Sequence, residues 1–316
     1  MSLCFETGGM LTSVQDEGRF GYQQLGVSPA GPMDARAFRI ANILVGNQMG
    51  VGALETTYLG PTILFESDCV VAITGADMSP MIDHSPAPLY RVIPIRSGQR
   101  LKFDALKHGA RGYIAVSGGL DIPIMMGSRS TLIRNRLGGV EGRAIKAGDR
   151  VALLSPKSDL PNMDERWLPV ERYPKQGFFL RAIRGPQDGR FTRQGIKTFY
   201  QRAFTISKEF DRMGCRLEGP VIEQTDGANI MTDGLVAGSV QVPGNGQPII
   251  MLADRQSTGG YTKIATVISV DLPLLAQAKP GDSLSFVEVD IELAHSLYIR
   301  QKKGMQYLES QWCMQA

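Results

Sequence analysis

The chain has 316 residues, of which 43% are apolar and 21% charged, an ordinary balance for a globular protein. Its formal charge of +3 comes from 34 basic and 31 acidic residues dispersed along the chain, without a basic stripe interleaved with aromatic residues, which excludes nucleic acid as an expected partner. The length fits two domains of roughly 150 residues each.

The first 20 residues lack the charged start and apolar run of a targeting segment, and no later window approaches 18 apolar residues. We therefore expect a cytoplasmic protein with no membrane partner. The four cysteines, Cys4, Cys69, Cys215 and Cys313, are widely spaced and form no ligand pattern with the three histidines. We expect free thiols and no bound metal.

The predicted secondary structure is mainly β, because 36 glycines and 18 prolines punctuate many short β-type runs. Three helices are expected beside them. The first spans Ala35 to Val45 with Asp34 as its N-cap. The second is short and follows Asp271, and the third spans Ile291 to Gln311 as an amphipathic tail.

Two internal echoes favour a duplicated architecture. IKAGDRVALL, near residue 150, matches AKPGDSLSFV, near residue 283, and LGPTILFE matches LEGPVIEQ in the same order. The stretch 156–177 is rich in proline and charge and is the best candidate linker. The predicted domains are a first β-barrel half at 1–155, this linker, and a second β-barrel half with a C-terminal helix at 178–316.

Polar residues gather at two places in the first half. Gln15, Asp16 and Arg19 form one group near the N-terminus, whereas Asp34 fits an N-cap better than a catalyst. The stretch GSRST at 127–131 is either an oxyanion-binding loop or a plain polar turn.

The densest polar block lies at 239–269, where a buried strand leads directly into a polar, glycine-containing loop. Arg255 could hold a carboxylate or phosphate through paired donors, and Lys263 could supply a compact positive charge. Backbone N–H groups near Gly259 and Gly260 could bind an anionic oxygen. A hairpin end with solvated side chains is the alternative interpretation. Upstream, Asp211-Arg212 is either a substrate clamp or an ion pair in a turn.

Two motifs are missing from the sequence. There is no GxxxxGK[ST] phosphate loop, so any ATP must bind by other means. No lysine stands between two methionines, so the chain is not itself a biotin carrier, and any biotin would come from a partner.

Several ordered blocks together resemble the allophanate hydrolase subunit 2 family, also described as biotin-dependent carboxyltransferase-like proteins. The resemblance covers residues from about 9 to 287. Phe210, Cys215 and Ser257 depart from the residues usual in this family. The blocks that carry it are VQDEGRFGYQQLGVSPAGPMD, NILVGNQMGVGALETTYLGP, ITGAD, AVSGGLDIPIMMGSRST, DRMGCRLEGP, QVPGNGQPI, ADRQSTGGY and AQAKPGD.

The resemblance implies two cyclophilin-like β-barrel halves with a few short helices. The family resembles part of the carboxyltransferase portion of urea carboxylase, and its stand-alone bacterial members include the C subunit of ATP-dependent 5-oxoprolinase and the KipI antagonist. It therefore implies a hydrolase component that acts with a partner to phosphorylate 5-oxoproline for ring opening to L-glutamate, and that is inactive alone. The alternatives are a regulatory antagonist of a KipI-type kinase inhibitor and a carboxyltransferase component for a urea-like amide.

The implied partners are a protein like the B subunit of 5-oxoprolinase (allophanate hydrolase subunit 1 or KipI-like), a protein like its A subunit, of the LamB/YcsF type, and a small amide or lactam substrate. ATP would be shared with the B-type partner. The candidate catalytic residues are Arg255, Lys263, Asp211 and Arg212. The candidate substrate-binding residues are Gln241, Gln247, Gln256, Ser257, Thr258, Gly259, Gly260, Tyr261, Gln15, Asp16 and Arg19.

Overall fold

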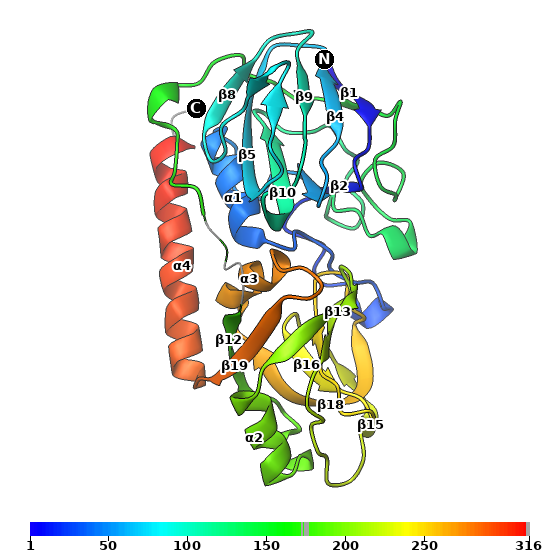
Figure 1. Cartoon of the computed structure of the whole chain (residues 1–316). Helices are drawn as coiled ribbons and strands as arrows, with labels where there is room; N and C mark the ends of the chain where they lie inside the picture. Colours follow the sequence, from blue (N-terminus) through cyan, green and yellow to red (C-terminus); the bar gives the residue numbers. More distant parts are fainter. Residues whose placement is uncertain (172, 174–176, 314–316) are drawn as a thin grey trace. The chain divides into compact units, whose positions relative to one another are not determined.

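The computed structural model describes residues 1–171, 173 and 177–313 (Figure 1). The chain divides into two compact units. The first contains Met1–Phe20, Ala30–Tyr173 and Lys303–Ala316, and the second contains Gly21–Pro29 and Pro174–Lys302. The division at Tyr173 places most of the expected linker, 156–177, in the first unit, and the chain returns to that unit at its end.

Two β-sheets form the first unit, as the short β-type runs predict. The six-stranded sheet has the order β11-β1-β4-β9-β6-β7, and the five-stranded sheet has the order β2-β3-β10-β5-β8. The strands are β1 (Ser2–Thr7), β2 (Leu11–Gln15), β3 (Ala53–Thr57), β4 (Thr62–Phe65), β5 (Cys69–Asp77), β6 (Met81–Ile82), β7 (Ser85–Pro86), β8 (Val92–Ile95), β9 (Arg100–Lys102), β10 (His108–Val116) and β11 (Arg150–Ala152).

The core of this unit lies between the two sheets. Leu3 and Phe5 of β1 and Ile63 of β4 share one apolar cluster with Leu54 of β3 and Ile114 of β10, and all five are fully buried. Because alternate side chains of a strand point to opposite faces, each sheet contributes one face to this core.

Helix α1 (Ala35–Leu44) covers the other face of the five-stranded sheet, alongside β5 and β10 (Figure 1). Its buried side chains pack with Ala72 and Tyr113 in a second apolar cluster. The expected N-cap is confirmed, since Asp34 Oδ1 accepts a hydrogen bond of 2.9 Å from the backbone N–H of Ala37. Capping by a side-chain carboxylate satisfies one of the free N–H groups of the first turn.

The last helix, α4 (Ile291–Trp312), confirms the expected C-terminal helix within one residue. Its second half belongs to the first unit, where Met305, 6% exposed, joins the cluster around α1 together with the partly buried Trp312. Two polar contacts hold this half in place. Arg166 Nη2 donates to the Trp312 carbonyl at 2.9 Å, and the Met49 N–H donates to Glu309 Oε1 at 2.9 Å.

The second unit is built on an eight-stranded sheet of order β12-β19-β13-β14-β17-β16-β18-β15. Because β12 also pairs with β18, the first seven of these strands close into a barrel and β15 extends β18 outside it. The strands are β12 (Phe178–Arg184), β13 (Phe204–Phe210), β14 (Gly214–Glu218), β15 (Asn229–Gly234), β16 (Ser239–Val242), β17 (Ile249–Met251), β18 (Thr258–Val267) and β19 (Ser283–Glu288).

Two helices accompany the barrel. Helix α3 (Leu272–Ala276) lies where a short helix after Asp271 is expected. Helix α2 (Arg193–Gln201) is not among the expected helices. Thr192 caps it by accepting a hydrogen bond from the Gly195 N–H at 2.9 Å, and Phe199 stacks on Phe286 of β19 with ring centroids 4.1 Å apart. One well-placed aromatic side chain therefore anchors this otherwise polar helix.

The echoed Gly-Asp segments form the same turn in both units. In each, the Asp carboxylate accepts a hydrogen bond of 2.8 Å from the N–H three residues earlier, at Lys146 for Asp149 and at Lys279 for Asp282. A strand follows each turn directly, β11 in the first unit and β19 in the second. The mainly β fold with a few helices is thus confirmed, and one of the two sequence echoes corresponds to a repeated piece of structure.

Among the described helices, none combines the length and apolarity that a membrane crossing needs.

Candidate functional site

Three neighbouring strands of the second barrel present alternating rows of side chains. Cys215 of β14, Ile250 of β17 and Val240 of β16 lie opposite one another and are fully buried in the core. One residue further along, Arg216 and Gln241 flank Ile249 in the same way. Because the side-chain period of a strand is two, this second row faces the opposite side of the sheet.

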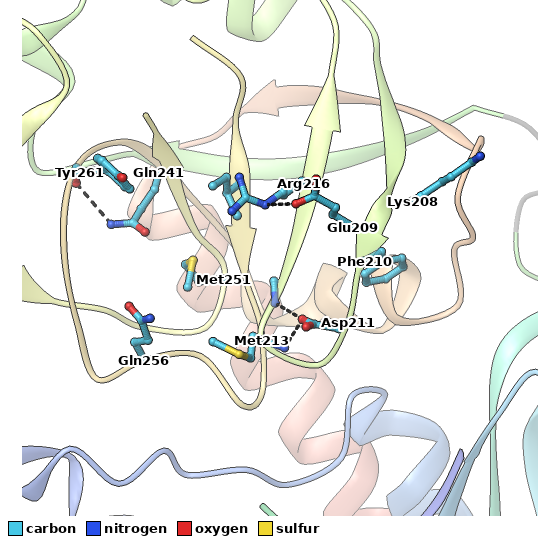
Figure 2. A pocket seen from close by; sticks show the side chains of 12 residues that line it. Lys208, Glu209, Phe210, Asp211, Met213, Arg216, Gln241, Met251, Gln256 and Tyr261 are labelled. Atoms are coloured by element: carbon cyan, nitrogen blue, oxygen red, sulfur yellow. Dashed lines mark hydrogen bonds and ion pairs between the residues drawn. The ribbon is translucent and has the colours of Figure 1, made fainter. Parts of the chain in front are cut away.

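The row of Arg216, Ile249 and Gln241 faces a cavity of about 540 Å³. Figure 2 shows its side chains, which come from β13, the β13–β14 turn, β14, β16, β17, β18 and the segment before β18. This volume is in the usual range of small-molecule sites. The lining residues are Lys208, Glu209, Phe210, Asp211, Met213, Gly214, Arg216, Gln241, Ile249, Met251, Gln256 and Tyr261.

Seven of the twelve lining residues carry polar or charged side chains, among them Gln241 and Arg216. Gln241 is 5% exposed, and its Nε2 lies 3.5 Å from the Tyr261 carbonyl, the longest contact drawn in Figure 2. Arg216 Nε lies 2.7 Å from Glu209 Oε2 in a pair whose side chains are 51% and 75% exposed. A lining that combines apolar side chains with a buried amide and several charged groups suits a small polar molecule.

Asp211 shapes the rim of the cavity. Its Oδ1 accepts hydrogen bonds from the N–H groups of Met213 at 2.7 Å and Gly214 at 3.0 Å, which closes the turn between β13 and β14 (Figure 2). Asp211, one of the predicted catalytic residues, therefore lies at the cavity, but one of its carboxylate oxygens stabilises the β13–β14 turn.

Arg212, the neighbour of Asp211, points elsewhere and is absent from the cavity lining. Its guanidinium binds Asp254 through two hydrogen bonds, Nε to Oδ2 at 2.9 Å and Nη2 to Oδ1 at 2.8 Å. Each of these side chains is 8% exposed. Of the two interpretations of Asp211-Arg212, the ion pair agrees with this geometry. The partner of Arg212 in that pair is Asp254 rather than Asp211.

Arg255 and Lys263, the other two predicted catalytic residues, also turn inward. Arg255 donates to the carbonyls of Leu235 and Leu252, both at 3.2 Å, and burial lowers its pKa although the Asp254 carboxylate opposes this. Lys263, 3% exposed, donates from Nζ to Asp233 Oδ2 at 2.5 Å and to the Gly234 carbonyl at 3.1 Å. These contacts join β18 and its preceding turn to the β15 region.

The remaining predicted residues of the second unit divide between the cavity and the chain around it. Gln256 and Tyr261 line the cavity. The side chain of Gln247 bridges to Gly219 with hydrogen bonds of 2.8 and 3.0 Å, outside the cavity lining. The Ser257 carbonyl accepts from Leu235 at 2.9 Å. Thr258, Gly259 and Gly260 begin β18, where Thr258 and Gly259 pair with β15.

The N-terminal candidates lie in the first unit. Asp16 receives four hydrogen bonds, from the hydroxyls of Ser128 and Ser130 and the N–H groups of Arg129 and Gly18. Burial raises its pKa, but these hydrogen bonds outweigh burial and lower the pKa below its usual value. Asp16 thus holds together the GSRST turn that the sequence singles out.

The two neighbours of Asp16 in the predicted group are also internal. Gln15 Nε2 donates to Ser13 Oγ at 2.9 Å and to the Thr131 carbonyl at 3.2 Å. Arg19, 1% exposed, donates from Nη2 to the Ser130 carbonyl at 2.5 Å. All three residues contact the stretch Ser128–Thr131 and lie outside the cavity of the second unit.

The structure therefore brings four predicted residues together at the cavity, namely Asp211, Gln241, Gln256 and Tyr261. Arg216 and Lys208 are cavity residues that the sequence reasoning missed. The period-two pattern of GCRLE, with buried Cys215 and Leu217 around exposed Arg216, is the signal that could have found Arg216. Within the described part of the chain, no three His, Cys, Asp or Glu side chains are grouped so as to hold a metal ion.

Comparison with known proteins gives matches over at least 90% of this chain. The C subunit of 5-oxoprolinase from Escherichia coli is 39% identical over 304 residues, which are 96% of each chain. The solved urea carboxylase of Kluyveromyces lactis superposes with a TM-score of 0.90 at 29% identity, over 97% of this chain and 29% of that one. The solved structure of TTHA0988 gives a TM-score of 0.82 at 35% identity, over 90% of this chain and 56% of that one.

These two solved chains are much longer than this one, which spans 56% of TTHA0988 and 29% of the urea carboxylase. The model of the family described as "Carboxyltransferase domain, subdomain A and B" matches residues 25–288, which include most of both units and every residue that lines the cavity. The chain therefore belongs to the carboxyltransferase domain family, subdomains A and B.

Proposed function

We propose that the chain acts as the C subunit of a 5-oxoprolinase, a hydrolase that opens 5-oxoproline to L-glutamate. The observation that carries this proposal is the end-to-end match to the Escherichia coli protein of that name, which covers 96% of both chains. The alignment includes both compact units of this chain, so the same role within a multi-protein enzyme is the simplest inference.

The chemistry requires activation of a stable amide. A lactam resists water because its nitrogen lone pair is delocalised into the carbonyl. Transfer of the ATP γ-phosphoryl group to the lactam oxygen turns that oxygen into a leaving group. Water then adds to the carbon, and the ring C–N bond breaks to leave an acyl phosphate on the opened chain. A second water molecule hydrolyses this acyl phosphate to glutamate and inorganic phosphate. Such a reaction depends mainly on positioning and on donors aimed at developing negative charge.

In this proposal the chain binds the lactam and shares ATP with a B-type partner. The cavity of the second barrel, with the buried Gln241 amide and exposed Arg216, supports a role in holding the small molecule. The B-type partner then supplies the remaining catalytic groups of the phosphoryl transfer, and an A-type protein completes hydrolysis. We accordingly expect the chain alone to be inactive.

Reconstitution tests the proposal. The purified chain is mixed with its A-type and B-type partners, and ADP and glutamate are measured with and without 5-oxoproline. We expect 5-oxoproline-dependent release of both products, lost when any one protein is omitted. Absence of 5-oxoproline-dependent ATP hydrolysis from the complete mixture, with the corresponding Escherichia coli proteins active in parallel, would reject the proposal.

A carboxyltransferase acting on a urea-like amide is the second candidate. The TM-score of 0.90 to the Kluyveromyces lactis urea carboxylase favours it, and biotin would then be supplied by a partner protein. The discriminating assay adds a biotin carboxylase, a biotinylated carrier, bicarbonate and ATP, and follows the carboxylation of urea. Urea-dependent turnover in that mixture, with none on 5-oxoproline, would replace the first candidate by the second.

A further inference from the structure

The cavity of the second unit has two chemically different ends. Arg216 of β14 and Gln241 of β16 occupy matched positions on either side of Ile249 in β17. Since neighbouring strands lie about 4.8 Å apart, their Cα atoms are separated by roughly 10 Å, and both side chains start from the same face of the sheet. A guanidinium and a carboxamide thus flank an apolar floor.

The amide end is unusually enclosed for a polar side chain. Gln241 is 5% exposed, and its Nε2 makes one long contact of 3.5 Å with the Tyr261 carbonyl. No described residue donates a hydrogen bond to its Oε1, and the Gln241 side chain lines the cavity. Its carboxamide therefore keeps an acceptor and a second N–H that a molecule in the cavity can pair with.

The surrounding backbone is adapted to this glutamine. A side chain at Gly259 would place its Cβ 2.6 Å from Gln241 Nε2, so the glycine provides the space that the amide occupies. The ladder between β16 and β18 also shifts register between Val240 and Gln241. Such irregularities re-aim side chains and are common beside binding sites.

The guanidinium end is held more loosely. Arg216 pairs with Glu209, but half of the arginine side chain and three quarters of the glutamate side chain are exposed. Exposed ion pairs of this kind contribute little free energy, so Arg216 can exchange Glu209 for a ligand carboxylate at small cost. A guanidinium is well suited to this exchange because it binds carboxylates through paired donors.

We propose that this cavity binds a compact molecule that carries both a cyclic amide and a carboxylate, with the amide at Gln241 and the carboxylate at Arg216. A lactam presents its N–H and C=O on the same side, so it can pair with Oε1 and the spare N–H of Gln241 through two hydrogen bonds. This assignment rests on the proposed function and adds the orientation of the substrate. It makes Gln241 and Arg216 determinants of specificity.

Three probe molecules separate the two ends. 5-Oxoproline carries both groups, 2-pyrrolidinone has only the lactam, and cyclopentanecarboxylate has only the ring and the carboxylate. Binding to the full-length chain, without ATP or partners, is measured from NMR shift titrations. We expect 5-oxoproline to bind about ten times or more tightly than either fragment, since each fragment lacks one hydrogen-bonded end.

Variants then assign each end. Gln241→Leu should weaken the binding of 5-oxoproline and 2-pyrrolidinone alike, by about tenfold or more, and leave that of cyclopentanecarboxylate unchanged. Arg216→Gln should weaken the binding of 5-oxoproline and cyclopentanecarboxylate and leave that of 2-pyrrolidinone unchanged. A general loss of structure would affect all three probes together, so this crossed pattern reports recognition itself.

Two neighbouring glycines give a matched control for the geometry. Gly259→Ala should displace the Gln241 amide and reproduce the effect of Gln241→Leu. Gly260→Ala should change binding less than about twofold, because a Cβ there meets its nearest atoms only at 3.7 Å and 4.0 Å, ordinary contact distances. If Gly259→Ala and Gly260→Ala weaken binding equally, the geometry around Gly259 gives no support for a contact between the ligand and Gln241.

The binding experiments and the reconstitution test different claims, so one can fail while the other succeeds. If the complete enzyme hydrolyses 5-oxoproline but the chain does not bind it, or binds it equally well after Gln241→Leu and Arg216→Gln, the orientation is wrong and the function stands. If the crossed binding pattern is found but the complete mixture is inactive, the site stands and the proposed reaction falls.

Discussion

Arg212 and Asp254 face each other inside the second unit, with 8% of each side chain exposed. Two parallel hydrogen bonds connect the guanidinium and the carboxylate. The backbone adds a third link, because the Asp254 N–H donates to the Arg212 carbonyl at 2.8 Å. The pair therefore ties the β13–β14 turn to the chain that follows β17.

Removing one charge of this pair should leave the other buried without its partner. We expect Arg212→Leu to lower the free energy of unfolding by about 3–5 kcal/mol, measured by urea denaturation. Arg216→Leu, which breaks the exposed pair with Glu209, is the control and should cost less than about 1 kcal/mol. Similar losses from both variants would contradict a structural role for Arg212.

Asp16 gives the first unit a defined response to acid. Its hydrogen bonds lower its pKa below the ordinary 3.8, so the ionised form stabilises the fold at every pH above that value. This stabilisation is lost as the pH falls below 3.8 and through the lowered pKa of the folded protein. Asp16→Asn should destabilise by about 1–3 kcal/mol at about pH 6, and the difference from wild type should shrink below about pH 4. Urea denaturation across this acid range measures the difference, and a constant value would exclude Asp16 as the titrating group.

The sequence identified the polar character of 254–263 but not the direction of its side chains. From the sequence, Arg255 and Lys263 are predicted to be exposed cations, because the residues around them are polar and rich in glycine. Their actual partners, Leu235 and Asp233, lie 20 and 30 residues away and become neighbours only when β15 pairs with β18. Local patterns carry no information on such long-range contacts, so their predicted catalytic role remains a prediction.

At the scale of elements, the helices show which features can be predicted from local sequence signals alone. Helix α1 has a capping residue and an apolar face, and both α1 and α4 lie within one residue of their expected ends. Helix α2 has a glycine at Gly195 and few apolar residues, so its pattern is weak on its own. It is stabilised by Thr192 at its start and by the contact of Phe199 with Phe286, which comes from a distant strand.

The C-terminal half of α4 should contribute to the first unit through few residues. Met305 is 6% exposed and packs into the cluster around α1, whereas Tyr307, two positions on, is 65% exposed. We expect Met305→Ala to lower the free energy of unfolding by about 2–5 kcal/mol, and Tyr307→Ala by less than about 0.5 kcal/mol. Calorimetry of both variants checks this. A loss from Tyr307→Ala as large as that from Met305→Ala would mean that α4 packs differently.

At the scale of the whole molecule, two units with separate cores carry one repeated turn. Gly148 and Gly281 precede the aspartates of these turns with φ of 88° and 91°, a conformation that other residues adopt only with strain. The sequence echo identified the repeat because the turn needs this glycine and this aspartate. The boundaries were harder to predict, because the short segments that cross between units, such as Gly21–Pro29, carry no signal of their own.

The repeated glycines offer a test of how independently the units unfold. Gly148→Ala and Gly281→Ala should each cost about 1–2 kcal/mol, because no atom lies near the added Cβ and backbone strain is the main effect. Hydrogen exchange read by peptide should show faster exchange mainly in the first unit for Gly148→Ala and mainly in the second for Gly281→Ala. Uniform acceleration in both units would show that they unfold together.

The alternation of rows on β14, β17 and β16 constrains how this protein can change over time. On each of these strands the residue that lines the cavity is the direct chain neighbour of a core residue. The cavity residues are Arg216, Ile249 and Gln241, and their core neighbours are Cys215, Ile250 and Val240. Inserting or deleting one residue within these strands would exchange the two faces. A new ligand preference can therefore arise by substitution in the cavity row, whereas we expect length changes only in the connecting loops, such as the one between β16 and β17. Relatives that bind different ligands in this cavity should accordingly keep the lengths of these strands and differ in side chains.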